Sequence, residues 1–379
     1  MKRIALVTTS RADYGIQRPL LRLLAGDEAV DLSLIVGGMH LRAGFGMTVS
    51  EIEEDGFSIA ARVDHLSAGD GPADIAHAMA AGVAGYGEAF DRLRPEAVIL
   101  LGDRYEMMAA ALAAKAFPLA ICHLHGGELS LGVLDDSFRH AITKFAHLHF
   151  VACERYAQRV RQLGEEDWRI TVAGALGLDN LEALPLARPE DLAAQLDLAV
   201  DTPPVLVTYH PTTPDDDGAA LLAALGGIKA PMVFTAANAD AGGRALNARI
   251  EAFVAKRPQA RLVAHLGTAR YFGLMDWAVA MVGNSSSGIL EAASFKLPVV
   301  NIGDRQEGRE RPANVIDCDT ASGEILKALD RARSQAFRAE IAAMVNPFRS
   351  ARSASEVVFE TIKETSLDRR LLKKGFVDQ

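Results

Sequence analysis

Short apolar runs alternate with helical patterns along most of the chain, and nearly every run ends in a polar or glycine-rich turn. In the first half the runs lie at 4–8, 31–36, 97–101, from 119 into HLHGGE (123–128), and at 170–173. In the second half they lie at 205–209, 232–235, 261–265, 279–282 and 299–302. Strands and helices in this alternating order predict parallel sheets with helices on both faces.

The pattern weakens between 174 and 204, where four of the fifteen prolines lie. A domain boundary is expected there. The prediction is an α/β protein with two doubly wound, Rossmann-like domains facing a cleft. The N-terminal domain spans 1–180, the C-terminal domain 201–350, and a helical tail 351–379. Helices are expected at 17–24, with Pro19 in the first turn, at 72–93 and at 154–163.

Composition excludes several classes of protein. A formal net charge of -9 speaks against nucleic-acid binding. No apolar run reaches the roughly 20 residues of a membrane span. The chain starts directly with a strand rather than a signal peptide, and its three cysteines form no metal or redox motif. We therefore expect a cytoplasmic protein with reduced thiols.

Charged groups follow consecutive strands of the first half. Asp103 and Arg104 come after the run 97–101, and His125 and Glu128 follow the next run. Ligands of open parallel sheets bind outside the carboxyl ends of the strands. Asp135 and Asp136 lie where the next helix begins, so its dipole should favour their ionised forms and make them better bases or charge stabilisers than acids. A helix cap with an ion pair to Arg139 or His140 is the alternative for either carboxylate.

The other histidines of this region, His123, His140, His147 and His149, are expected to be packed side chains with local partners. A His-x-His metal site at 123 and 125 remains an alternative, but further ligands are not evident. The prediction is therefore that the protein holds no metal and no cofactor. The first strand also ends in TTSRADYG rather than G-x-G-x-x-G, which disfavours a dinucleotide.

The second half carries groups suited to an anionic nucleotide. GNSSSG (283–288) lies between a strand and an expected helix at 289–295, so backbone N–H groups and the Ser285 and Ser286 hydroxyls could bind phosphate. Glu291, one turn into that helix, could accept hydrogen bonds from ribose. His210, Asn238 and Arg305 follow neighbouring strands, and Arg11 follows the first strand of the chain. Arg11 could bind phosphate or form a surface ion pair with Asp13.

Seven motifs carry a resemblance to a known family. They are GDRYE (102–106), HLHGGE (123–128), DDSFRHAITKFAHLHF (135–150), GALGLDN (174–180), NADAG (238–242), GNSSSG (283–288) and NIGDRQEGRE (301–310). Together they resemble the hydrolysing UDP-N-acetylglucosamine 2-epimerases of sialic-acid biosynthesis, which have the glycosyltransferase-B architecture. The resemblance covers nearly the whole chain.

The resemblance implies roles for individual residues. The positions matching those that hold UDP are Arg11, Arg104, His210, Ser285, Ser286, Glu291 and Arg305, with Asn238 close by and Leu266 near the uracil. Asp103, Asp135 and Asp136 match catalytic carboxylates. His125 stands where many relatives have glutamate, so the acid/base role could pass to His125, Glu128 or Asp136.

The implied reaction converts UDP-N-acetylglucosamine and water into UDP and N-acetylmannosamine through a 2-acetamidoglucal. The alternative substrate is UDP-N,N'-diacetylbacillosamine, which leads to legionaminic acid. The family also implies a homo-oligomer, either a dimer or a tetramer. A glycosyltransferase of the same fold and a non-catalytic sugar-nucleotide sensor are the rival functions.

Overall fold

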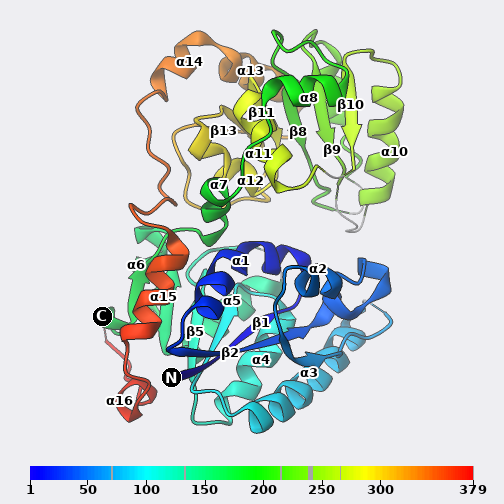
Figure 1. The fold of residues 1–379 in the computed structure, drawn as a ribbon. Helices are drawn as coiled ribbons and strands as arrows, with labels where there is room; N and C mark the ends of the chain where they lie inside the picture. Colours follow the sequence, from blue (N-terminus) through cyan, green and yellow to red (C-terminus); the bar gives the residue numbers. More distant parts are fainter. Residues whose placement is uncertain (70, 132–133, 214–215, 238–241, 265, 379) are drawn as a thin grey trace. The chain divides into compact units, whose positions relative to one another are not determined.

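The computed structural model describes residues 1–69, 71–131, 134–213, 216–237, 242–264 and 266–378. The chain forms two compact units, one of Met1–Asn180 with Phe348–Gln379 and one of Leu181–Pro347 (Figure 1). The C-terminal tail thus belongs by its contacts to the first unit. Among the described residues, no helix combines the length and apolar composition that a membrane span needs.

The first unit is built on a seven-stranded parallel sheet in the order β3-β2-β1-β4-β5-β6-β7. Its strands are β1 (Lys2–Thr8), β2 (Val30–Gly37), β3 (Ile59–Val63), β4 (Ala97–Leu101), β5 (Ala120–Leu124), β6 (Leu148–Val151) and β7 (Ile170–Val172). The central strands β4 and β5 are buried at every position, which explains why they read as continuous apolar runs. Strand β3, absent from the prediction, lies at the edge of the sheet and is only partly buried.

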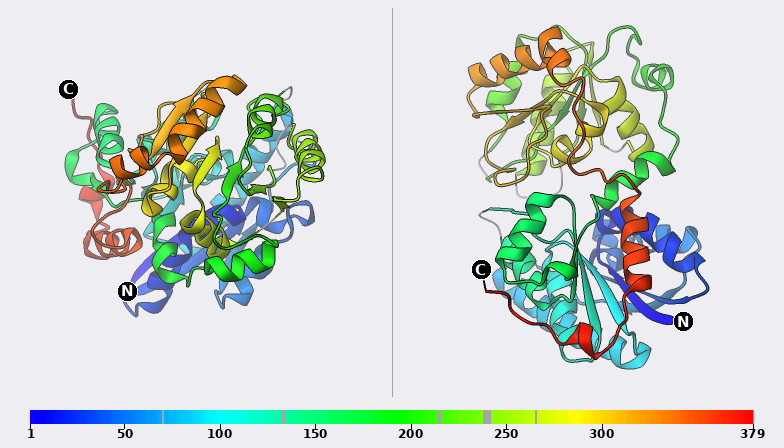
Figure 2. Two further views of the ribbon diagram at one scale, coloured as in Figure 1. Left: turned by 90° about the horizontal axis from the view of Figure 1, so that it is seen from above. Right: turned by 90° about the vertical axis from the view of Figure 1, so that its left-hand side faces the viewer.

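Helices cover both faces of this sheet. The helices α3 (Pro72–Leu93), α4 (Tyr105–Lys115) and α5 (Leu134–Phe145) pack side by side in a row. The other face carries α1 (Arg11–Gly26) packed against α15 (Ala354–Glu364), as Figure 2 shows. The chain reverses its direction of winding between β1 and β4, and right-handed crossovers then place the two groups of helices on opposite faces.

Helix α1 begins earlier than the sequence predicts. It starts at Arg11 because the Ser10 hydroxyl caps it, accepting a hydrogen bond from the backbone N–H of Asp13. Pro19 therefore lies inside the helix rather than in its first turn, and it cannot donate to the carbonyl of Gly15. The Asn180 side chain donates to that carbonyl instead, at 3.0 Å. A residue of the GALGLDN motif thus compensates for the proline.

The second unit repeats the architecture with a six-stranded parallel sheet, ordered β10-β9-β8-β11-β12-β13. Its strands are β8 (Val205–Thr208), β9 (Met232–Thr235), β10 (Ala260–Val263), β11 (Ala280–Gly283), β12 (Val299–Ile302) and β13 (Val315–Cys318). Its main helices are α8 (Pro189–Leu196), α9 (Ala219–Gly226), α10 (Gly243–Val254), α11 (Thr268–Trp277) and α13 (Ser322–Arg333). Two apolar clusters, one on each face of the sheet, form its core. Both units are doubly wound α/β domains, as the sequence predicts.

The remaining helices include α6 (Glu154–Gln162), close to the predicted 154–163. The others are α2 (Val49–Glu54), α7 (Asn180–Ala183), α12 (Ser287–Leu290), α14 (Gln335–Glu340) and α16 (Arg369–Leu372). The C-terminal tail thus contains two helices, α15 and α16, rather than one long one. The Asp179 carboxylate fixes the start of α15 by accepting hydrogen bonds from the backbone N–H groups of Ala354 and Ser355.

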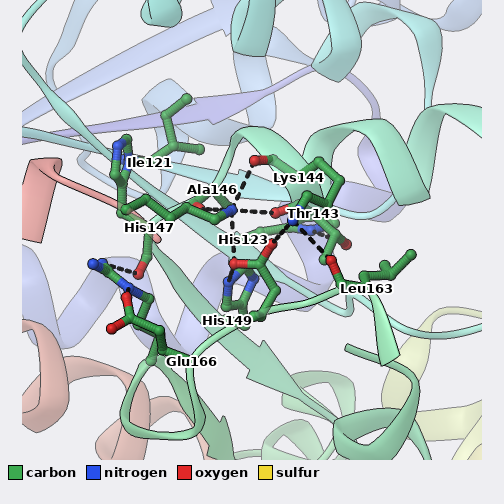
Figure 3. A network of polar contacts seen from close by, with 12 residues as sticks. Ile121, His123, Thr143, Lys144, Ala146, His147, His149, Leu163 and Glu166 are labelled. Carbon is green, nitrogen blue, oxygen red and sulfur yellow. Dashed lines mark hydrogen bonds and ion pairs between the residues drawn. The ribbon is translucent and has the colours of Figure 1, made fainter. Parts of the chain in front are cut away.

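A buried polar network attaches the end of the tail to the first unit. The Lys374 ammonium donates to the carbonyls of Lys144 and Ala146, both at 2.7 Å, at the C-terminal end of helix α5. It also lies 2.7 Å from the Glu165 carboxylate, which contacts Lys144 and His149 as well. Lys144, Ala146 and His149 are labelled in the view of this network in Figure 3. Cations at a helix C-terminus are favourable, so Lys374 stabilises the last turn of α5.

The network affects the ionisation of its members. Burial alone would raise the pKa of Glu165, but hydrogen bonds from His149, Lys144 and Lys374 outweigh it and lower the pKa to about 2. Burial lowers the pKa of Lys374 to about 8, partly offset by Glu165. Both groups are therefore mainly charged at neutral pH.

Replacing Lys374 with methionine should lower the free energy of unfolding at pH 7 by about 2 kcal/mol, the usual loss for a charge-assisted hydrogen bond. Lys373→Met is the matched control, because Lys373 is the exposed neighbour. The folded-state pKa of Glu165 is lowered, so its stabilisation is complete above its unfolded pKa and is lost as pH falls toward 2. The difference in free energy of unfolding between the parent and Lys374→Met, measured by urea titration, should therefore decrease below about pH 4.5. Equal free energies of unfolding for the parent and Lys374→Met at pH 7 would contradict a stabilising role of the network.

Candidate active site

The strand order of the first unit reverses between β1 and β4, and the polar residues gather at the carboxyl ends of these strands. Such switch points are the usual ligand sites of doubly wound sheets. Gly102 follows β4 with a φ of +74°, a left-handed turn that suits glycine. Asp103 and Arg104 come directly after this turn, and His125 follows the neighbouring strand β5.

Asp103 forms an ion pair with Arg139 of helix α5. Arg139 also donates to the Ser130 hydroxyl at 3.1 Å, and its guanidinium lies 4.0 Å from the Glu128 carboxylate. The sequence suggested Asp135 or Asp136 as partners for Arg139, and this is wrong. Arg139 lies on the buried face of α5, 4% exposed, whereas the two aspartates are only partly buried. In the folded protein, Arg139 therefore pairs with a residue that follows a strand rather than with residues of its own helix.

The partly buried His125 and the buried Glu128 form a dyad. The His125 Nδ1 lies 2.8 Å from the Glu128 carboxylate, which accepts when ionised, so Nδ1–H donates and, in the neutral imidazole, Nε2 carries the lone pair. Nε2 is itself buried and has no hydrogen-bond partner in the part of the chain that the structure describes. His125 has a φ of +64°, and strain of this kind in a non-glycine residue is typical of functional sites. A histidine oriented by a carboxylate is suited to accept or donate a proton.

Asp135 differs from the prediction in its electrostatics. Burial raises its pKa, the nearby Arg104 lowers it, and Glu106 raises it, with a net upward shift. The sequence suggested that the helix dipole would favour the ionised form, so this expectation is wrong. Desolvation is the larger effect because Asp135 is partly removed from water beside a second carboxylate. A carboxyl group that retains its proton longer is better suited to act as an acid.

Asp136 has local partners. One of its carboxylate oxygens accepts the backbone N–H of Ser130 at 2.6 Å, and the other lies 3.6 Å from the His140 Nε2. The contact with His140 matches the ion pair of the alternative expectation, whereas the hydrogen bond goes to the loop before α5 and is not the expected helix cap. Asp136 thus holds the loop at Ser130, which in turn contacts Arg139.

Arg104 connects several acidic groups. It pairs with Glu106 at 2.8 Å, and its charge also lowers the pKa of the buried Asp13 against the larger effect of burial, which raises it. Asp13 accepts a hydrogen bond from Thr9 at 2.7 Å. Sequence reasoning did not include Glu106 or Asp13 in the site. Their positions, two residues after Arg104 and Arg11, were the available signal.

Arg11 is exposed at the start of α1 and pairs with Glu51 at 3.2 Å. The predicted alternative partner, Asp13, instead faces Thr9 and Ser10. An exposed guanidinium with a surface partner can still exchange that partner for phosphate, so the proposed role of Arg11 does not depend on this ion pair.

His123 is a structural residue, which confirms the expectation of packed histidines. Its Nε2 lies 2.7 Å from the Gly102 carbonyl, which can only accept, so Nε2 carries the proton. Its Nδ1 lies 3.1 Å from the Thr143 hydroxyl, and burial lowers the pKa to about 3. His147 and His149 likewise have buried partners. With both ring nitrogens of His123 engaged, the metal alternative finds no support, and no cluster of potential metal ligands occurs among the described residues.

In the second unit the strand order reverses between β8 and β11, and the GNSSSG segment lies at this point. Gly283 has a φ of +147°, and a side chain there would collide with the Thr208 carbonyl, 1.8 Å from the Cβ position. The Ser287 hydroxyl bonds to Ser285 at 3.0 Å and to Tyr271 at 2.7 Å. Tyr271, which the sequence did not indicate, thus orders the serine segment from α11.

The helix after these serines is shorter than predicted. Helix α12 covers only Ser287–Leu290, followed by the 3-10 turn Ala292–Phe295, so Glu291 lies at the junction rather than inside a helix. The N–H groups of Gly288 and Ile289 already bond to serine carbonyls. One helical turn has a weak dipole. Any anion site here therefore depends on the Ser285 and Ser286 hydroxyls more than on a helix terminus.

Asn284 organises the adjacent loops. Its side chain exchanges two hydrogen bonds with the backbone of His210, at 2.8 and 2.7 Å. Its carbonyl accepts from Arg305 at 3.1 Å and from Gln306 at 2.9 Å. His210, Arg305 and the serines thus belong to one connected group at the carboxyl edge of the sheet. Leu266 is a buried residue of this unit, and Asn238 lies outside the described residues.

A family model described as UDP-N-acetylglucosamine 2-epimerase matches residues 22–363. A hydrolysing GDP/UDP-N,N'-diacetylbacillosamine 2-epimerase from Campylobacter jejuni is 36% identical over 100% of this chain and 99% of its own. A hydrolysing UDP-N,N'-diacetylbacillosamine 2-epimerase from Legionella pneumophila is 38% identical, covering 88% and 89%. A UDP-N-acetylglucosamine 2-epimerase from Neisseria meningitidis is 30% identical over 88% of each chain.

The crystal structure of the UDP-N-acetylglucosamine 2-epimerase from Neisseria meningitidis bound to UDP-N-acetylglucosamine has the same fold, with a TM-score of 0.82. It covers 96% of this chain and 100% of that one at 14% identity. The two doubly wound units with polar switch points define a sugar-nucleotide enzyme of the glycosyltransferase-B architecture. The chain belongs to the UDP-N-acetylglucosamine 2-epimerase family, whose hydrolysing members include the relatives with the higher identities.

Proposed function

We propose that the protein is a hydrolysing 2-epimerase that converts UDP-N,N'-diacetylbacillosamine and water into UDP and the 2-epimeric free sugar. The sequence alone favoured UDP-N-acetylglucosamine and kept the diacetylated sugar as the alternative. The relatives at 36% and 38% identity act by name on the diacetylated sugar, and the one at 30% by name on N-acetylglucosamine. This difference is the reason for preferring the alternative.

The observation that carries the chemistry is the His125–Glu128 dyad linked through Arg139 to Asp103. The C2 hydrogen of a sugar is not acidic until the bond from C1 to the UDP oxygen breaks and C1 gains positive character. In the proposed reaction, a basic group of this cluster then takes the C2 proton and leaves a C1=C2 glycal. Two groups of opposite role are needed, since the proton returns to C2 from the other face.

The candidates for these roles differ in their surroundings. His125 presents the Nε2 lone pair of a carboxylate-oriented imidazole and is the preferred base. Asp135, whose pKa burial raises, is the preferred acid. Asp103 balances Arg139 and remains a candidate for either step. Water adds to C1 of the glycal as the proton is delivered to C2, which completes hydrolysis with inversion at C2.

The second unit is proposed to hold the leaving group. Arg305, His210, Ser285 and Ser286 supply donors to the diphosphate, and Glu291 can accept from ribose hydroxyls. Arg11 and Arg104 would contribute further positive charge. The roles of Leu266 near the uracil and of Asn238 near UDP are proposed from the family resemblance alone. The reaction needs no metal in this scheme, because the cationic side chains stabilise the developing negative charge of UDP.

The test is to incubate the purified protein separately with UDP-N,N'-diacetylbacillosamine, its GDP analogue and UDP-N-acetylglucosamine. The GDP sugar is included because the name of the Campylobacter jejuni relative covers both nucleotides. We expect a free 2-epimeric sugar and UDP, with the highest kcat/KM for UDP-N,N'-diacetylbacillosamine and no acceptor required. Release of sugar only when an acceptor is present would indicate a glycosyltransferase. Binding without turnover would indicate a sensor.

A further inference from the structure

We propose that a pocket beside Arg104 in the first unit receives the substituents on C4 and C6 of the sugar and so determines which UDP-sugar is epimerised. The inference rests on the proposed function and concerns the substrate selectivity of the same site.

The pocket has a volume of about 470 Å³, within the range of small-molecule sites. It lies at the carboxyl ends of β2, β3 and β4. The 3-10 turn Gly38–Leu41 after β2 contributes Met39, the segment after β3 contributes Leu66 and Ser67, and the start of α4 contributes Tyr105. Helix α3 contributes Ile75 and Ala78. All these elements belong to the first unit.

Arg104 is shared by the pocket and the group of acid/base residues. Its side chain lines the pocket and lies 3.8 Å from the Met39 sulfur. The same guanidinium interacts electrostatically with Asp135, shifting the pKa of that carboxyl downward against burial. Asp103 is the preceding residue. A sugar ring positioned for chemistry at these carboxylates would therefore lie close to Arg104 and to the pocket that Arg104 lines.

The lining is suited to apolar substituents. Met39, Phe45, Leu66, Ile75 and Ala78 supply hydrocarbon and thioether surface. Phe45 is 52% exposed in the glycine-rich loop between Gly44 and Gly46, so a ligand would cover an aromatic ring that now faces water. Burial of methyl groups against such surface is favourable, whereas hydroxyls without partners lose hydrogen bonds to water.

The two candidate sugars differ at these positions. N,N'-diacetylbacillosamine has an acetamido group on C4 and a methyl group at C6, where N-acetylglucosamine has a hydroxyl and a hydroxymethyl group. The two methyl groups suit the apolar lining. The acetamido N–H needs one acceptor. The Asp74 carboxylate lines the same pocket and, within the described part of the chain, accepts the Gly71 N–H at 3.2 Å, which leaves it capacity for a second donor. The pocket therefore favours the diacetylated sugar.

The experiment uses two variants that change the pocket in opposite ways, one by adding a larger side chain and one by removing a side chain. Ala78→Leu fills the pocket from helix α3, and Phe45→Ala removes an exposed wall without disturbing the core. Ala81→Leu, an exposed position on the same helix outside the pocket, is the matched control. For each protein, kcat/KM is measured with UDP-N,N'-diacetylbacillosamine. UDP-N-acetylglucosamine is followed by turnover or, where turnover is too slow, as a competitive inhibitor, and UDP binding is measured by calorimetry.

We expect both pocket variants to lose about 10- to 100-fold in kcat/KM for the diacetylated sugar, the usual effect of a mismatch in an apolar pocket. The values for UDP-N-acetylglucosamine and UDP should change by less than about 3-fold, since neither fills the pocket. Equal losses for both sugars, or no loss in Phe45→Ala, would overturn the pocket assignment. Absence of parent activity on the diacetylated sugar would overturn the proposed substrate itself, so the two failures are distinguishable.

Discussion

Replacing His125 with asparagine should lower kcat by about 10²- to 10⁴-fold, the usual loss when a proton-transfer group is removed. Asparagine retains a polar group of similar reach but cannot exchange a proton. The His125 Nδ1 is held 2.8 Å from Glu128, and the buried Nε2 has no other partner among the described residues. The dyad therefore holds one basic nitrogen in a fixed direction.

Two further variants isolate this role. Glu128→Gln keeps a hydrogen bond to His125 but removes the charge, so its loss in kcat should be smaller than that of His125→Asn. His77→Asn is the control, since His77 is exposed on α3, and it should behave like the parent. UDP affinity should be unchanged in all three. If His125→Asn has a kcat near the parent value, His125 is not the base, and Asp103 or Asp135 becomes the candidate for that role.

Turnover in deuterium oxide should give a product with deuterium at C2, and Asp103→Asn should lower kcat by about 10²- to 10⁴-fold. The label is expected because the C2 proton leaves to an enzyme group that exchanges with solvent before reprotonation. Protium at C2 would indicate simple hydrolysis or internal return of the same proton. A product with the original configuration at C2 would exclude epimerisation.

The ion pair with Arg139 requires a control for Asp103→Asn, because this change removes the carboxylate closest to the buried guanidinium. Arg139→Gln and the double variant complete a cycle. If Asp103 serves only to hold Arg139, both single variants and the double variant should lose kcat equally. We expect Asp103→Asn to lose more than Arg139→Gln, as a group that also takes part in chemistry should. Thermal unfolding of each variant separates loss of stability from loss of turnover.

Much of the fold could be predicted from local sequence patterns. Strands β4, β9 and β12 and helix α3 coincide with their predicted bounds, because strands buried on both faces read as apolar runs and α3 begins at a proline. The edge strands β3 and β13 were missed because they are only partly buried and lack such runs. The start of α1 was missed because a capping serine and the distant Asn180 make Pro19 tolerable inside a helix.

The candidate site was likewise predicted only in part from the sequence. Polar residues that directly follow strands could be predicted, since the carboxyl ends of parallel strands share one edge of the sheet. Their partners could not. Arg139 pairs with Asp103, 36 residues away, rather than with neighbours on its helix. The sequence also could not indicate the raised pKa of Asp135, because desolvation depends on all the atoms packed around a group whereas a helix dipole is local.

The sequence by itself determined the family, the two doubly wound domains and the strand ends that carry the candidate site. These features depend on apolar periodicity and short motifs, which are properties of neighbouring residues. Only the tertiary structure decided that His125 is oriented by Glu128, that His123 is a structural residue, and that the tail is attached through Lys374. It also placed Met39, Leu66 and Ala78 around one pocket beside Arg104. Such contacts join segments far apart in the chain, and packing alone brings them together.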